Sequence, residues 1–69
     1  MPEPLVRIPP DPVALVRRDV RRLGELAGAR RWGLTPRQAL RVAARLPVPL
    51  AVVAAVYRVA LAKLEALRG

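Results

Sequence analysis

Apolar residues recur at helical spacing in three stretches of the chain, and prolines or glycines separate these stretches. The stretches cover about residues 13–31, 36–46 and 49–67. An α-helix turns by about 100° per residue, so apolar positions spaced three and four apart fall on one side of it. The pattern therefore predicts three helices joined by short turns.

The first predicted helix, residues 13–31, is amphipathic. Asp11 is expected as its N-cap with Pro12 at the first helical position, and Gly33 follows its last turn. Gly24 and Gly28 weaken a helix without necessarily ending it. Its expected apolar side consists of Val13, Val16, Val20, Leu23, Leu26 and Ala27. Its opposite side carries Arg17, Arg18, Arg21 and Arg22.

The second predicted helix, residues 36–46, begins with the same kind of signal, a threonine followed by a proline. Arg37, Arg41 and Arg45 are spaced four residues apart and are expected to share one side of this helix. Small and apolar residues occupy the rest, and the helix contains no acidic residue. Pro47 and Pro49 then interrupt the chain, and Pro49 is well placed to open the third helix.

The third predicted helix, residues 49–67, is apolar over most of its surface. Two short helices cannot cover such a long apolar side, so we expect another copy of the chain to cover part of it. The expected oligomer interface consists of Leu50, Val53, Tyr57, Leu61, Leu64 and Leu67. The sequence therefore predicts a homo-oligomer.

The first twelve residues contain five of the eight prolines. Proline fixes φ and lacks an N–H donor, so residues 1–12 are expected to form an extended arm. Together these patterns predict an all-α protein, in which residues 13–69 form one small three-helix bundle behind a proline-rich N-terminal arm.

The residue inventory argues against an enzyme. The chain has no cysteine, histidine or serine, only one threonine and five carboxylates among 69 residues. It therefore lacks a nucleophile–base pair, the usual zinc ligands and disulfides. We expect no catalytic residue, no metal site and no cofactor. A chain this short usually needs a further source of stability, and oligomerisation is the one left to it.

The charge is strongly basic, with thirteen basic residues against five acidic ones and a net charge of +8. Nearly all of the excess lies between Arg17 and Arg45. This density predicts a polyanionic partner, foremost double-stranded DNA, bound mainly through phosphates with little base readout. The expected contact residues are Arg17, Arg18, Arg21, Arg22, Arg37, Arg41, Arg45 and Arg58. The alternatives are an acidic protein surface and a solvated helix face, and a GC-rich genome also explains the preference for arginine over lysine.

Residues 35–58, TPRQALRVAARLPVPLAVVAAVYR, resemble a helix-turn-helix unit, the DNA-binding motif of many transcription regulators. Ala43 stands where the family keeps a small residue, and Pro47 replaces the usual turn glycine. Leu46 and Val48 bracket the turn, and Val53 and Val56 correspond to positions that pack back. Among the outward positions of the second helix only Arg58 offers hydrogen-bond donors to base edges.

Two other segments, LVRIPPD (5–11) and GLTPRQALRVAA (33–44), are similar to parts of ribbon-helix-helix repressors. That resemblance implies an obligate dimer that reads DNA with a paired β-ribbon. Arg7 would then face the groove, and backbone amides around Thr35 would hold a phosphate. The spacer between the two segments is about two helical turns longer than the family pattern.

A different class of function remains open, a protein-interaction module. Such a small regulator, phage-type inhibitor or assembly subunit would dock on a larger protein through residues 49–67.

Membrane association is not expected, because this helix carries few basic residues and the apolar run 46–57 is too short to span a bilayer. With no apolar signal segment at the start, a cytoplasmic location is expected. Trp32 is interpreted as a side chain covering the core rather than one stacking on a base.

Overall fold

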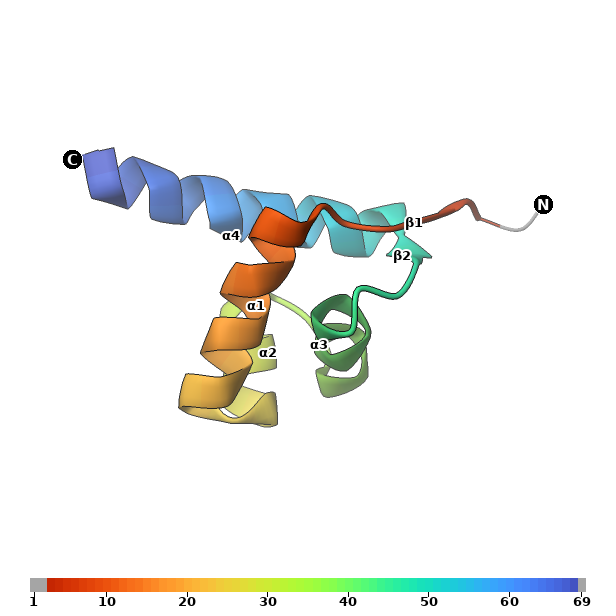
Figure 1. The fold of residues 1–69 in the computed structure, drawn as a ribbon, viewed down its shortest axis with the longest axis horizontal. Coiled ribbons are helices and arrows are strands. Elements are labelled where there is room, and N and C mark those ends of the chain that lie inside the picture. The colour runs from red at the N-terminus through yellow and green to blue at the C-terminus, as the bar shows by residue number, and fades with distance from the viewer. Residues whose placement is uncertain (1–2, 69) are drawn as a thin grey trace.

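The computed structural model describes residues 3–68 as four helices and a two-stranded antiparallel sheet (Figure 1). In chain order the elements are β1 (Leu5–Val6), α1 (Pro10–Leu23), α2 (Glu25–Arg31), α3 (Pro36–Ala43), β2 (Val48–Pro49) and α4 (Leu50–Arg68). A mostly helical protein is therefore confirmed. The expectation of three helices was wrong in detail, because the described part of the chain contains four helices and a small sheet.

The long helix α4 lies across the other three helices (Figure 1). α1, α2 and α3 lie on the same side of α4, with α1 nearest its middle and α3 near its N-terminal end. The C-terminal end of α4 extends beyond α1, while β1 runs beside the beginning of α4. The rest of the chain therefore covers α4 from its beginning to about Lys63.

The core lies between α1, α2, α3 and the inner side of α4. Buried apolar residues come from every element except β1: Ile8, Val13, Val16, Ala29, Trp32, Leu34, Ala39, Val42, Val48, Val52, Val56 and Ala60. The three that α4 contributes are spaced four residues apart and form one stripe. Trp32 is completely buried, which confirms its interpretation as a core residue.

The single helix expected over residues 13–31 is interrupted at Gly24. Gly24 has a φ of +88°, a conformation that glycine adopts without steric cost. Its N–H donates to the Val20 carbonyl and ends α1, and its own carbonyl accepts from the Gly28 N–H in α2. Helix propensity alone gives no sign of a positive φ, which is why the sequence pattern missed this break.

Gly28 allows α2 to fold back closely on α1. A Cβ atom added at Gly28 would lie only 2.8 Å from the Val20 Cα, a backbone atom that has little room to move. The reversal also changes which side chains are buried. Leu23 and Leu26, both expected on the apolar side, are exposed, and Ala29 takes a buried place in α2 instead.

The N-terminal segment is extended as expected, but it is shorter than 1–12 and forms part of the domain. Residues 1–2 lie outside the described residues, and α1 already begins at Pro10 without a side-chain cap from Asp11. β1 pairs with β2 in the register Leu5↔Pro49 and Val6↔Val48. Ile8, which follows β1, is buried in the core. The pairing was not visible in the sequence because each strand is only two residues long.

α3 ends at Ala43, three residues earlier than expected. The N–H groups of Arg45 and Leu46 donate to the carbonyls of Val42 and Arg41, which is the hydrogen-bond pattern of a Schellman turn. Arg45 occupies the position with a φ of +57°, where glycine is usual and where an L-residue is strained. The chain then enters β2, so Pro49 lies in a strand and α4 starts one residue later than expected.

We predict that Gly28→Ala destabilises the fold by about 1–3 kcal/mol through overpacking against the α1 backbone. Alanine favours helix over glycine by about 1 kcal/mol, so intrinsic propensity alone predicts the opposite sign. Urea unfolding followed by circular dichroism at fixed protein concentration measures the difference. Ala27→Ser, at an exposed neighbouring position of α2, serves as the control and should change stability little.

Candidate nucleic-acid interface

The turn between α2 and α3 is fixed at both ends by local hydrogen bonds. Gly33, with a φ of +67°, and Leu34 donate their N–H groups to the carbonyls of Arg30 and Ala29 and close α2 in a second Schellman turn. Thr35 Oγ1 accepts from the Gln38 N–H at 3.2 Å, and Gln38 Oε1 accepts from the Thr35 N–H at 3.0 Å. This capping box starts α3 where the threonine–proline signal predicted.

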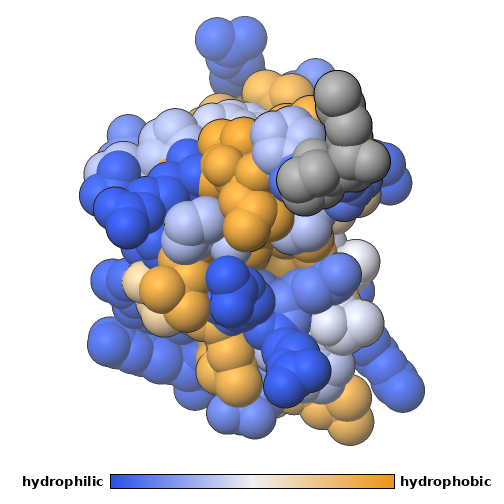
Figure 2. All heavy atoms as spheres, turned by 90° about the vertical axis from the view of Figure 1, so that its right-hand side faces the viewer, coloured by the Kyte–Doolittle hydropathy of each residue, from blue (hydrophilic) through white to orange (hydrophobic). Residues whose placement is uncertain are grey.

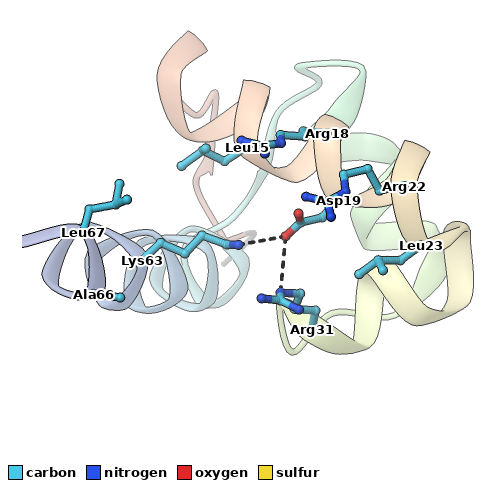
Figure 3. A pocket seen from close by; sticks show the side chains of 9 residues that line it. All are labelled: Leu15, Arg18, Asp19, Arg22, Leu23, Arg31, Lys63, Ala66 and Leu67. Atoms are coloured by element: carbon cyan, nitrogen blue, oxygen red, sulfur yellow. Dashed lines mark ion pairs between the residues drawn. The ribbon is translucent and has the colours of Figure 1, made fainter. Parts of the chain in front are cut away.

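Asp19 ties three helices together at the edge of the core. Its carboxylate, on α1, accepts a hydrogen bond of 2.8 Å from Trp32 Nε1 at the end of α2. Lys63 of α4 lies 3.2 Å from the same oxygen and Arg31 of α2 lies 3.7 Å from it (Figure 3). The Lys63 ammonium also lies 5.8 Å from the centre of the Trp32 ring, within cation–π range.

The surroundings of Asp19 favour its ionised form. Burial by itself raises the pKa of this carboxyl group. The hydrogen bonds from Trp32 and Lys63 and the positive charges of Lys63 and Arg31 outweigh burial, so the pKa of Asp19 lies below its ordinary value. A buried carboxylate with these partners is charged at neutral pH and holds α1, α2 and α4 in place.

α3 presents a basic outer side next to a packed inner side. Ala39 and Val42 are buried against the core, whereas Arg37, Leu40 and Arg41 are exposed. The Arg41 Nη2 donates to the Pro47 carbonyl at 2.8 Å, so this side chain also holds the segment that leads to β2. The end of the molecule that carries α3 and the two strands shows strongly hydrophilic side chains around separate apolar patches (Figure 2).

The four arginines of α1 do not form one surface. Arg17 directs its guanidinium toward α3, where Nε and Nη2 donate to the Ala43 carbonyl at 3.1 and 2.6 Å. Arg21 lies one turn further on the same side of α1. Arg18 and Arg22 instead line a pocket between α1 and the C-terminal part of α4 (Figure 3). The structure therefore divides the basic side expected for this helix between two places.

The remaining two basic candidates lie outside α3 and α1. Arg45 is not on the helical row with Arg37 and Arg41, because α3 ends at Ala43, and its Nε donates to the Ile8 carbonyl at 3.3 Å. Arg58 is exposed on α4. Of the eight arginines named from the sequence, Arg37 and Arg41 lie on α3, Arg17 contacts its last residue and Arg45 lies in the turn that follows it.

The segment 35–58 differs in geometry from the helix-turn-helix pattern that it resembles. Six residues, including β2, separate α3 from α4. The strand expected from the second resemblance exists as β1, but it pairs with β2 of the same chain. Of the backbone amides around Thr35, that of Thr35 itself donates to Gln38.

The expected oligomer residues lie mostly on the open side of α4. Leu50, Tyr57, Leu61, Leu64 and Leu67 are exposed, and the exposed fraction reaches 84% at Leu67. Val53 differs from the other five, because it is partly buried against the core. The side of α4 that faces the core is the one with Val52, Val56 and Ala60.

Sequence reasoning missed Asp19, Arg31 and Lys63. With Trp32, the last two join the helices through the Asp19 carboxylate. One signal was present in the pattern. Asp19 follows Val13 and Val16 at a spacing of three residues, so it lies on the apolar side of α1 among the positions that face the core. A lone acid there requires a buried partner, and Trp32 is the one indole donor in the chain.

No family model matches this chain, and no curated protein or solved structure matches it either. Within residues 3–68, no helix combines the length and the hydropathy needed to cross a bilayer.

We predict that Asp19→Ala lowers the free energy of unfolding by about 1–3 kcal/mol, because the buried Trp32 N–H then has no acceptor. Asp19→Asn retains an oxygen acceptor and should cost less. Chemical unfolding of both variants and of the wild type, followed by Trp32 fluorescence, gives the comparison.

The stabilising effect of the Asp19 charge should depend on pH. The pKa of this group in the unfolded chain is about 3.9, and in the folded chain it is lower. The ionised group therefore stabilises the fold fully above pH about 4, and this contribution is lost as the pH falls through the folded pKa. The stability difference between wild type and Asp19→Asn should therefore shrink as the pH falls below about 4. A stability difference that stays constant down to the pH at which the protein unfolds in acid would contradict this account.

Proposed function

We propose that the protein binds double-stranded DNA, with α3 against the major groove and neighbouring arginines on the phosphates. The observation that carries the proposal is the outer side of α3. Arg37 and Arg41 are exposed there, Arg17 reaches the end of the same helix, and α3 contains no acidic residue. Its inner side is packed through Ala39 and Val42, so these groups project from a fixed support.

The connection between α2 and α3 supports the same proposal. Four residues, 32–35, join the two helices, and they include Gly33. Helix-turn-helix units join two helices by a turn of three or four residues that often contains glycine, and the second helix enters the groove. We therefore assign the unit to α2 and α3 rather than to residues 35–58, where β2 separates the helices.

The proposed contacts are mainly electrostatic. Arg37 and Arg41 are spaced by about 6 Å along the helix axis, and guanidinium groups bind phosphate oxygens through paired N–H donors. Leu40, which lies between these two arginines in the chain, is also exposed. It offers only apolar contact, which suits a thymine methyl group. Such a surface binds DNA with a strong dependence on salt and with limited selection of sequence.

We predict that Arg37→Gln weakens binding to duplex DNA and reduces the slope of log affinity against log salt by about 0.9, the contribution of one phosphate contact. Fluorescence anisotropy of a labelled duplex at several salt concentrations measures both quantities.

Arg22→Gln is the matched control, since it removes the same charge from the side of α1 that lines the pocket with α4. It should leave the slope nearly unchanged. Equal slopes for both variants would show that net charge rather than the α3 surface governs binding. Absence of binding by the wild type at low salt would overturn the proposal.

The open side of α4 favours a second role, contact with another protein chain, and we propose a second copy of this chain as the partner. Leu50, Tyr57, Leu61 and Leu64 form a stripe on this side. A stripe of this length on a soluble chain is the kind of surface that pairs with another helix.

Charge complementarity favours an antiparallel pairing of two α4 helices. Arg58 and Glu65 are seven residues apart, so they lie on the same side of α4, one on each side of Leu61 in the chain. A two-fold axis near Leu61 brings Arg58 of one copy opposite Glu65 of the other, twice per dimer. Isologous contacts of this kind are the commonest in homo-oligomers.

We predict that Leu61→Asp converts the dimer to a monomer, because it places a charge at the centre of the apolar contact. Arg58→Glu alone should weaken the dimer by roughly 1 kcal/mol, which is about fivefold in the association constant, and Arg58→Glu/Glu65→Arg should restore it. Sedimentation equilibrium measures the association constants. A wild-type chain that is monomeric at all concentrations would favour docking on a different protein, and a double variant as weak as the single one would exclude this register.

A further inference from the structure

A pocket of about 330 Å³ opens between α1, the end of α2 and the C-terminal part of α4 (Figure 3). None of the residues lining it belongs to α3. Its volume falls at the small end of the range of about 300–1,000 Å³ that is usual for sites of small ligands. It is therefore a separate feature from the proposed DNA-binding surface.

The polar part of the pocket is strongly positive. Arg18, Arg22, Arg31 and Lys63 line it together with a single carboxylate, that of Asp19. Asp19 is already paired with Arg31 and Lys63, and the oxygen that faces them, Oδ2, also accepts the hydrogen bond from Trp32 Nε1. Within residues 3–68, no hydrogen bond or ion pair engages the guanidinium groups of Arg18 and Arg22. Two cations thus point into the pocket without a counter-ion (Figure 3).

The rest of the pocket is apolar. Leu15 and Leu23 of α1 and Leu67 at the end of α4 contribute to its lining. Leu23 and Leu67 are both exposed, so a ligand that covers them removes apolar surface from water. An inorganic ion would leave these leucines uncovered, and a nucleic-acid backbone has no apolar group of matching size.

We propose that this pocket binds a small organic anion with an apolar chain or ring, namely a carboxylate or a phosphate monoester. The anionic group pairs with Arg18 and Arg22, whose planar guanidinium groups suit both head groups. The apolar part covers Leu15, Leu23 and Leu67. The Asp19 carboxylate occupies Arg31 and Lys63, which leaves the two arginines of α1 as the head-group site. The proposal does not depend on DNA binding by α3.

Isothermal titration calorimetry of the full chain with octanoate and with octyl phosphate tests the proposal and distinguishes the two head groups. We expect at least one of them to bind saturably at one molecule per chain. Octanol, which lacks the charge, and acetate, which lacks the chain, should each bind at least tenfold more weakly.

Two sets of variants locate the site. Arg18→Glu/Arg22→Glu should weaken binding at least tenfold, whereas Arg21→Glu, on the same helix but outside the pocket, should not. Leu67 lies near the end of α4 and is 84% exposed, so Leu67→Gln should weaken binding without disturbing the fold. This variant keeps the test decisive if the double variant unfolds.

Several outcomes would overturn the proposal. These are binding of octanol as tight as that of octanoate, retention of octanoate binding by both pocket variants, and absence of saturable binding in the millimolar range. Binding of poly-glutamate without binding of either small anion would also overturn it, because the pocket would then belong to an acidic protein partner.

Discussion

The hydrogen bond between the Trp32 indole and the Asp19 carboxylate is the contact on which the arrangement of the helices depends. It joins α1 to the end of α2 inside the core, and the same carboxylate holds Lys63 of α4. A chain of 69 residues without cysteine or histidine has no disulfide or usual zinc site to stabilise it. One buried carboxylate, with partners on α2 and α4, supplies a specific link between three helices. Apolar packing alone is non-directional.

The excess of arginine serves more than one purpose in this fold. Arg17, Arg41 and Arg45 donate to backbone carbonyls at the end of α3 and in the segments before α1 and β2. These bonds hold a turn in which Arg45 adopts a positive φ. Arg37 remains available on the outer side of α3, and Arg18 and Arg22 face the pocket. Net charge thus predicts an anionic partner in general, but neighbouring elements decide which arginines are free to meet one.

Signals that act between residues close in the chain predicted the structure correctly, whereas contacts between distant residues left no such signal. The capping signal at Thr35 and the glycine after α2 act within a few residues, and both were interpreted correctly. α4 was predicted to within one residue at each end, because long apolar periodicity is a strong signal. The break at Gly24, the pairing of β1 with β2 and the role of Asp19 depend on residues that meet only after folding. No local pattern distinguishes a glycine that weakens a helix from one that ends it.

The sequence alone predicted a mostly helical protein, the start of α3 and the position of α4 to within one residue, together with the strongly basic charge. These properties follow from backbone preferences, periodicity and composition, which are local or additive. Three features follow from tertiary contacts alone: α2 folds back on α1, one acid is buried, and the basic row of α1 is divided between α3 and a pocket. Those outcomes depend on distances between side chains far apart in the chain, such as Arg17 and Ala43, and periodicity contains no information about them.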